Sequence, residues 1–278
     1  MNLMLWSTEL TDKMMPVLES LRNLGFDGVE VPIFDYNLDK WKIWRKKLDD
    51  IGLERTAVTV LNEENNPISA DKKIRLRSLE NVKMSLECCQ ELDAKILVGP
   101  LHSALGVFSG KGATNDEWRW GVETVKNMSE YAAKSNISLG IEFLNRFENY
   151  FLTCAEDTVK FVKEIDHPNC GILYDTFHAH IEEKDHSKAI RGCSEYIISV
   201  HISENDRSTP GKGNMNWNAV FDGLKEIGYD SWFIIEAFGQ SLDELSAATK
   251  IWRRMYENEE QLARDGLKFI KQEVAKRW

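Results

Sequence analysis

Short apolar runs alternate along this chain with longer segments in which apolar residues recur at helical spacing. The apolar runs lie at 3–6, 28–31, 56–60, 96–99, 137–142, 170–175, 197–201 and 232–236. Each has the length of a strand buried on both faces, as in a parallel sheet. The amphipathic segments predict helices at 12–24, 38–51, 71–92, 115–135, 153–166, 184–194 and 216–228, and from about 241 to the last residue. Eight alternating units are typical of a (β/α)8 barrel.

No feature of the sequence divides the chain into smaller units. There is no low-complexity segment or linker, and 278 residues is about the length of one large α/β barrel. Gly25, Gly52 and Gly228 each follow an apolar helical run, where a residue in the left-handed conformation ends a helix. We therefore expect one α/β domain, a single TIM barrel that spans residues 1–278 and ends in a long carboxyl-terminal helix.

The composition is that of a globular protein. Of the residues, 42% are hydrophobic and 29% are charged, and no apolar run approaches the ~20 residues that a membrane span needs. Thr8 and Glu9 follow Met1–Trp6 at once, without the basic flank and apolar core of a signal peptide. The five cysteines form no CxxC pair, and their odd number argues against a disulfide framework. We expect a cytoplasmic protein.

The charge balance limits the class of partner. The chain has 35 Lys and Arg against 45 Asp and Glu, a formal charge of −10, and a pI of about 5.2. A net negative surface repels nucleic-acid phosphates and does not favour anionic membranes. We therefore expect a small, neutral substrate, with no nucleic-acid or membrane partner.

Four of the predicted strands end in a carboxylate or an imidazole, namely Glu142, Asp175, His201 and Glu236. Each follows the one before by about one βα unit, so the four side chains come from consecutive strands and meet at the carboxyl end of the barrel. Buried acidic groups at one edge repel each other unless a cation neutralises them. Three carboxylates and one imidazole suit Mn²⁺, Mg²⁺ or Co²⁺ better than a structural zinc.

Around these residues the sequence contains four longer motifs. They are Glu142–Glu148 (EFLNRFE), Asp175–Glu183 (DTFHAHIEE), His201–Arg207 (HISENDR) with Pro210–Gly213 (PGKG), and Glu236–Phe238 (EAF). In these motifs the sequence resembles the ketose 3-epimerases of the D-tagatose 3-epimerase and D-allulose 3-epimerase type, within the xylose isomerase-like barrel superfamily. The resemblance covers the second half of the chain closely. It covers the first half through strand order and Gly99–Gly106 (GPLHSALG).

This resemblance implies roles for individual residues. It implies that Glu142, Asp175, His201 and Glu236 bind a metal, usually Mn²⁺, and that Glu148, His178 and Arg207 contact the sugar. It also implies a homodimer or homotetramer. An apolar surface on the last predicted helix agrees with an interface, and its residues are Leu245, Ile251, Trp252, Met255 and Tyr256. Two positions depart from the pattern, because Ala237 stands where many relatives have Pro and Asp206 where the tagatose enzymes have Asn.

The implied reaction assigns two roles to carboxylates. Inversion of a carbon next to a ketone needs one group to remove the C3 proton and another to return a proton on the opposite face of a flat enediolate. Glu142 and Glu236 fit these roles and also bind the metal. Asp175 and His201 are then mainly structural ligands.

Other hypotheses remain open at this point. The same site could move a proton between C1 and C2, as in an aldose–ketose or hydroxypyruvate-type isomerase, or could act on a keto-sugar. A metal-dependent endonuclease on the same barrel ranks low, because six histidines and an acidic surface fit it poorly. A binding protein that lost the chemistry is disfavoured, since both glutamates are present.

Each expected sugar contact also has a purely structural interpretation. His178 could bond only a loop carbonyl. Arg207 could pair with Asp206 or Glu204 on a solvated loop. Glu148 could pair with Arg146. The surroundings of each side chain distinguish between these interpretations.

Overall fold

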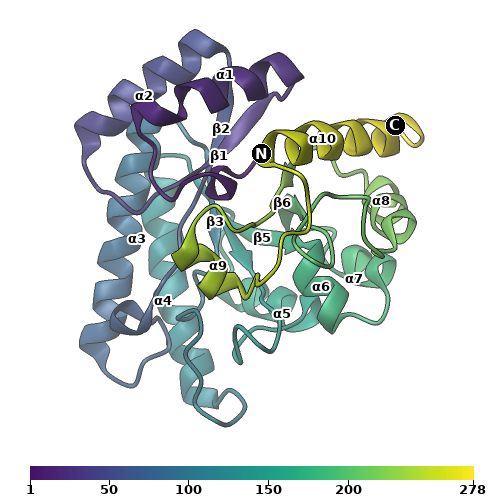
Figure 1. Ribbon diagram of the computed structural model, residues 1–278. Coiled ribbons are helices and arrows are strands. Elements are labelled where there is room, and N and C mark those ends of the chain that lie inside the picture. The colour runs from purple at the N-terminus through teal and green to yellow at the C-terminus, as the bar shows by residue number, and fades with distance from the viewer.

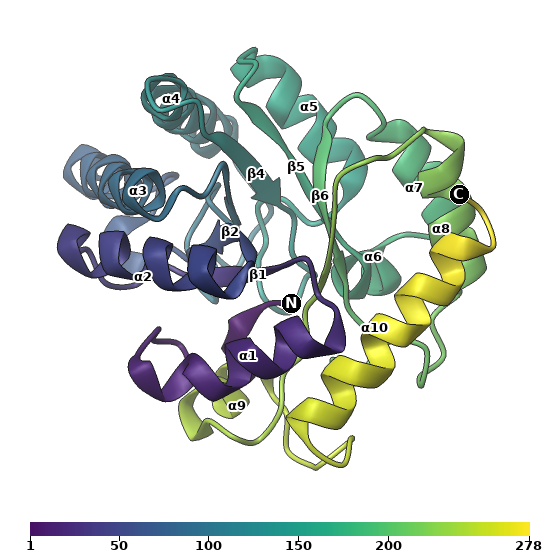
Figure 2. The same ribbon diagram turned by 90° about the horizontal axis from the view of Figure 1, so that it is seen from above.

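A computed structural model of the chain describes all 278 residues. Seven parallel strands form one sheet in sequential order and curl into a nearly closed barrel (Figures 1 and 2). The strands are β1 (Gly28–Pro32), β2 (Glu54–Val58), β3 (Ile96–Gly99), β4 (Ser138–Glu142), β5 (Cys170–Asp175), β6 (Ile197–Ile202) and β7 (Trp232–Ile235). The α/β barrel expected from the sequence is confirmed.

The predicted first strand at 3–6 is wrong. Leu3–Leu5 is a 3-10 helix, η1, because the Asn2 side chain accepts a hydrogen bond from the Met4 N–H at 2.9 Å and caps that turn. Met1 and Asn2 fill the place of an eighth strand between β7 and β1, and the Met1 carbonyl accepts from the Glu30 N–H at 2.8 Å. Asn2 forms an isolated parallel bridge with Glu30, and its N–H donates to the Ile235 carbonyl at 2.9 Å.

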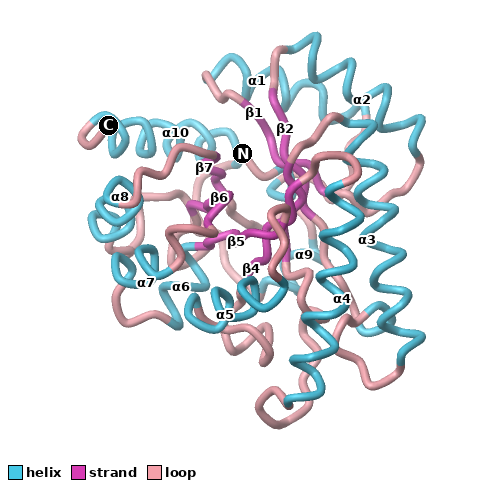
Figure 3. Tube along the Cα trace, turned by 180° about the vertical axis from the view of Figure 1, so that it is seen from behind, coloured by secondary structure: helices cyan, strands magenta, loops and turns pink.

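Helices surround the strands as an outer ring (Figure 3). They are α1 (Met15–Leu24), α2 (Leu38–Ile51), α3 (Lys72–Leu92), α4 (Asn115–Ala133), α5 (Ala155–Ile165), α6 (Thr176–Glu182), α7 (His186–Gly192), α8 (Trp217–Glu226), α9 (Asp243–Thr249) and α10 (Glu259–Ala275), with short 3-10 helices η2 (Asp12–Met14) and η3 (Glu63–Asn65). Most predicted helices are present within a few residues. Helix α6 was not predicted, and it begins where the Asp175 side chain accepts from the Phe177 N–H at 2.6 Å. None of the helices combines the length and hydropathy of a membrane span.

The single long helix expected from residue 241 onward is wrong. It is two helices, α9 and α10, which run in different directions (Figure 1). Lys250 ends α9 with a φ of 62°, and the Asn258 side chain caps α10 by accepting from the Gln261 N–H at 2.8 Å. In the segment between them Ile251 is buried, while Trp252 is 69% exposed. The apolar residues expected on one helix face therefore do not lie on a common face.

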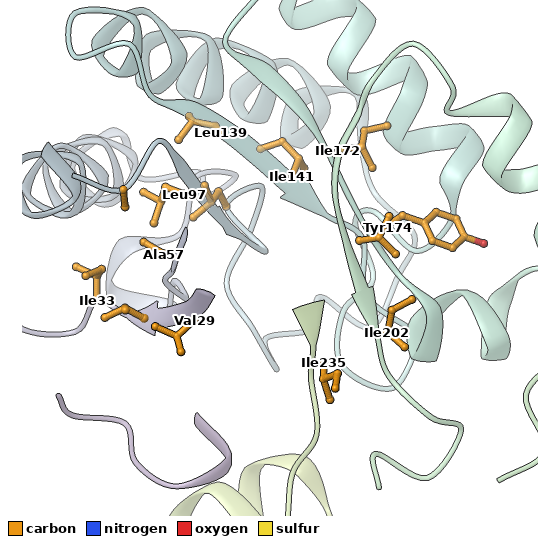
Figure 4. Packing of buried hydrophobic residues seen from close by; sticks show 14 of the residues in the cluster. Val29, Ile33, Ala57, Leu97, Leu139, Ile141, Ile172, Tyr174, Ile202 and Ile235 are labelled. Atoms are coloured by element: carbon orange, nitrogen blue, oxygen red, sulfur yellow. The ribbon is translucent and has the colours of Figure 1, made fainter. Parts of the chain in front are cut away.

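Side chains alternate between the two faces of the barrel wall, as they do in any strand. One large apolar cluster fills the space between strands and helices, and Figure 4 labels Leu139 and Ile141 of β4 and Ile172 and Tyr174 of β5 in it. A smaller cluster contains Leu173 and other residues that alternate with these. Glu142 and Asp175 continue the inward series of their strands. The same alternation turns His201 inward between Val200 and Ile202 of the large cluster.

Candidate functional site

The four residues expected to bind a metal lie together. Glu142 ends β4, Asp175 ends β5, His201 lies in β6 and Glu236 directly follows β7. One ligand atom from each lies within 4.8 Å of the others, and all four side chains are buried. Four consecutive strands thus place three carboxylates and one imidazole at one point inside the barrel.

The surroundings of His201 fit a cation. Its Nδ1 lies 3.3 Å from Glu236 Oε1 and 3.7 Å from Asp175 Oδ2, yet neither ring nitrogen makes a well-aligned hydrogen bond. Burial lowers the pKa of His201, but the charges of Glu30 and Glu236 outweigh it and raise the pKa well above 6.5. A buried imidazole among three carboxylates is a donor set that a divalent ion uses. This group can therefore bind a divalent metal.

The two glutamates of this group differ in their affinity for protons. Burial, followed by the charge of Glu236, raises the pKa of Glu142 well above 4.5. Burial also raises the pKa of Glu236, but His201 and Arg207 outweigh it and lower the value to about 2. Without a metal, the pKa of Glu142 is therefore shifted up and that of Glu236 down by their different neighbours.

Arg207 lies inside the barrel. Its Nη1 donates to Asp175 Oδ2 at 3.2 Å and also to Glu236 Oε2. Its guanidinium carbon stacks 3.9 Å from the centre of the Phe177 ring. The interpretation in which Arg207 pairs with Asp206 or Glu204 on a solvated loop is therefore wrong.

His178 contacts the same arginine. Its Nε2 lies 3.0 Å from Arg207 Nη2 and 3.6 Å from Glu142 Oε1. Its Nδ1 accepts from the Asn145 backbone N–H at 3.0 Å. Burial, and then the charge of Arg207, lower the pKa of His178 to about 3, so the ring is neutral. It bonds no loop carbonyl, and it faces the metal-binding group.

Glu148 lies at the edge of this arrangement. Its Oε1 accepts from Asn145 Nδ2 at 2.8 Å, and the same amide lies 2.9 Å from His178 Nδ1. Arg146 instead pairs with Glu182 at 2.9 Å. The interpretation of Glu148 as the partner of Arg146 is therefore wrong. All seven residues expected at the site belong to one connected set.

Sequence reasoning missed a buried carboxylate that fixes the loop after β6. Glu204 Oε1 accepts from the Asn205 and Met215 N–H groups at 3.1 Å, and its Oε2 accepts from the Gly211 N–H at 2.8 Å and from Trp217 Nε1 at 3.0 Å. Arg207, with a φ of 62°, lies in this loop. The only signal in the sequence was an acidic residue three positions after His201.

Glu30 and Asn2 were also missed, although both contact the metal-binding group. Glu30 Oε1 lies 2.8 Å from His201 Nε2, and Asn2 Nδ2 donates to Glu236 Oε1 at 3.2 Å. The signal for Glu30 is a lone carboxylate between two valines of a strand. No signal marks Asn2, because its contacts arise only when the barrel closes.

The chain is similar to known proteins over most of its length. The family model described as "Xylose isomerase-like TIM barrel" matches residues 18–273. The D-psicose 3-epimerase of Agrobacterium fabrum is 32% identical over 252 residues, which cover 89% of this chain and 87% of that protein. The L-ribulose 3-epimerase of Mesorhizobium japonicum is 30% identical over 256 residues, 91% of this chain and 86% of that protein.

Solved structures match over the whole length. A structure of L-ribulose 3-epimerase superposes with a TM-score of 0.93 at 28% identity and covers 100% of this chain and 94% of that one. D-psicose 3-epimerase from Clostridium cellulolyticum H10, solved with D-tagatose, gives a TM-score of 0.91 at 27% identity, with 99% and 97% covered. The chain therefore belongs to the xylose isomerase-like TIM barrel family and, within it, to the ketose 3-epimerases.

Proposed function

We propose that this protein is a metal-dependent ketose 3-epimerase that inverts C3 of a free tagatose-, allulose- or ribulose-like sugar. The observation that carries the proposal is the convergence of Glu142 and Glu236, two buried carboxyls, on one candidate metal site. The D-psicose and L-ribulose 3-epimerases among the relatives support the same reaction.

Four residues would hold the ion, namely Glu142, Asp175, His201 and Glu236. Their oxygen-rich donor set favours Mn²⁺, with Mg²⁺ or Co²⁺ as alternatives. A bound ion supplies Lewis-acid stabilisation of negative charge on the substrate oxygens. Asp175 and His201 act as ligands only, because the Asp175 side chain also caps α6 and His201 is fully enclosed.

The two glutamates carry the protons. One of the two carboxylates removes the C3 proton, and the other, once protonated, returns a proton on the opposite face of the enediolate. For the other epimer the two residues exchange roles, since the reaction is reversible.

Arg207 and His178 would orient the sugar. They lie side by side at the metal-binding group, with Arg207 Nη2 3.0 Å from His178 Nε2. A sugar oxygen that accepts from the charged guanidinium would be stabilised as it gains negative charge. Glu148, which Asn145 links to His178, would contact a hydroxyl of the same sugar.

The test is proton exchange in D₂O. EDTA-treated protein reloaded with Mn²⁺ is incubated with a panel of free ketoses, and deuterium is followed by NMR. Deuterium at C3 together with the C3 epimer supports the proposal. Exchange at C1 with an aldose formed would make the enzyme an aldose–ketose isomerase. Inversion at another carbon of a keto-sugar would make it an epimerase of that keto-sugar. No exchange with any ketose would contradict the proposed substrate class.

The quaternary structure belongs to the same proposal. We propose that residues 1–278 act as one domain and that the enzyme is a homodimer or homotetramer, as the family resemblance implies. Light scattering after size-exclusion chromatography measures the mass directly against the 32.0 kDa of one chain. A mass of one chain at micromolar concentration would overturn the assembly without affecting the chemistry.

A further inference from the structure

Glu30 is a buried carboxylate inside the barrel that the proposed chemistry does not use. It lies on β1 between Val29 and Val31, whose side chains point outward into the large apolar cluster, so Glu30 itself points inward. Its side chain is 0% exposed, and the only side chain that forms an ion pair with it is His201, with 2.8 Å between Glu30 Oε1 and His201 Nε2. A charge buried this completely needs a specific partner.

Two neutral donors hold this carboxylate in place. Thr56 Oγ1 on β2 donates to Glu30 Oε2 at 3.2 Å, and Asn2 Nδ2 donates to Glu30 Oε1 at 3.0 Å. The Asn2 amide can point only one way, because its oxygen accepts from the Met4 N–H. Its nitrogen therefore faces the two carboxylates of Glu30 and Glu236.

We propose that Glu30 is a positioning residue for the metal centre. Its carboxylate lies 2.8 Å from His201 Nε2, in an ion-pair contact that is not aligned as a hydrogen bond. With the metal bound, this contact would keep the proton of His201 on Nε2 and leave the Nδ1 lone pair directed toward Asp175 and Glu236. Asn2 fixes the distance between Glu30 and Glu236, so the ligand from β6 and the ligand after β7 are set by one hydrogen-bonded group. This inference rests on the proposed metal site.

The physical effect is on ligand geometry and basicity. A carboxylate that accepts the second N–H of a ligating histidine fixes the ring orientation and raises the electron density at the ligating nitrogen. Loss of such a partner typically weakens metal binding by about 10–100-fold. Removal of Glu30 should therefore weaken the binding of the ion more than it changes the chemistry once the ion is bound.

The test is Glu30→Gln, measured by calorimetric titration of EDTA-treated protein with Mn²⁺. We expect the Kd for Mn²⁺ to rise about 10–100-fold, and turnover to recover in part at saturating Mn²⁺. Glu30→Asp keeps the charge but withdraws the carboxylate from Nε2, and it should weaken Mn²⁺ binding as well. If Glu30→Gln fails to fold, the Kd of Glu30→Asp for Mn²⁺ tests the proposal. Glu273→Gln is the matched control, because Glu273 is a buried carboxylate on α10 that pairs with Arg277 at 2.7 Å.

The outcomes separate this inference from the proposed function. Wild-type Mn²⁺ affinity in folded Glu30→Gln or Glu30→Asp would overturn the positioning role and leave the metal site intact. No binding of Mn²⁺ by the wild type would overturn the metal site and this inference together. A lower thermal stability with unchanged Mn²⁺ affinity would assign Glu30 a structural role only. An equal loss of affinity in Glu273→Gln would show that the effect is one of net charge.

Discussion

Arg207 Nη2 lies 3.0 Å from His178 Nε2, with its N–H directed at that ring nitrogen. The Asn145 backbone N–H lies 3.0 Å from the other ring nitrogen, Nδ1. Burial, and then the charge of Arg207, lower the pKa of the ring to about 3. Because Arg207 also donates to Asp175 and Glu236, it joins His178 to the metal-binding group.

Replacement of Arg207 by Lys tests this relationship. Lysine keeps the charge but has neither the planar fork that reaches Asp175, Glu236 and His178 nor the face that stacks on Phe177. We expect kcat/KM for the ketose to fall about 10–100-fold, the value of one charge-assisted hydrogen bond. Steady-state kinetics with saturating Mn²⁺ measure it.

Arg146→Lys serves as the control for that substitution. Its side chain is mostly exposed and pairs with Glu182 rather than with the site, so kcat/KM should stay near the wild-type value. Unchanged kinetics in Arg207→Lys would show that Arg207 does not contact the sugar.

Glu142→Gln and Glu236→Gln should each leave a folded protein with little epimerase activity. Loss of one acid–base group typically costs ~10²–10⁴-fold. In the proposed mechanism each glutamate faces one side of C3. Each variant should therefore still exchange the C3 hydrogen of one epimer with D₂O, and the two variants should prefer opposite epimers.

The metal content of both variants must be measured as well, since both residues also belong to the candidate metal site. Exchange is followed by NMR at saturating Mn²⁺, with bound metal determined by elemental analysis. If both variants exchanged the same epimer, a single base would serve both faces. Wild-type turnover in Glu142→Gln with metal bound would remove Glu142 from the mechanism.

The sequence predicts that Glu142, Asp175, His201 and Glu236 lie together, because each of these residues is local to a strand. Glu142 and Asp175 end apolar runs, and the rule that barrel chemistry lies at the carboxyl ends of strands brings them together without knowledge of any contact. Asn2 shows the opposite case. Its bond to Glu236 joins residues 234 positions apart and exists only because Asn2 fills the place between β7 and β1.

The errors in the fold share a physical cause. Leu3–Leu5 and the segment around Ile251 both have apolar patterns, and apolar content alone does not distinguish a strand or a helix from an irregular segment that packs inward. In both segments a side-chain cap sets where a helix begins: Asn2 caps η1 and Asn258 caps α10. Glu204 was missed for a related reason, since its four donors belong to a loop that periodicity does not describe.

Glu204→Gln should loosen the loop that carries Arg207 without affecting the ion. Its two carboxylate oxygens accept four N–H groups, and an amide offers only one acceptor oxygen and adds two donors. We expect KM for the ketose to rise about tenfold or more, equivalent to roughly 1.4 kcal/mol. Kinetics and calorimetric Mn²⁺ titration measure the two effects. A parallel loss of Mn²⁺ affinity would contradict the separation of loop and metal site.

Mn²⁺ should stabilise the folded chain. The buried carboxylates of Glu142, Asp175 and Glu236 repel each other, and an ion that binds only the folded state adds about 2.7 kcal/mol at 100 times its Kd. The midpoint of thermal unfolding should rise by about 5 °C or more relative to protein in EDTA. Asp175→Asn removes one charged ligand and should lose most of that rise. An equal rise in both proteins would place the stabilising ion elsewhere.

Acid should destabilise the metal-free protein through His102. This ring is 0% exposed, with Nε2 2.9 Å from the Glu142 carbonyl and Nδ1 2.8 Å from Ser103 Oγ, and burial lowers its pKa from 6.5 to about 3. Between those two pH values the unfolded chain binds a proton that the folded chain does not, so stability falls as the pH falls through that window. The free energy of unfolding is measured with denaturant in EDTA at a series of pH values. Below pH 6 it should change less steeply with pH in His102→Gln than in the wild type, by up to about 1.4 kcal/mol per pH unit, and above pH 7 the two slopes should be equal. An unchanged slope in the acid range would show that His102 is protonated inside the fold.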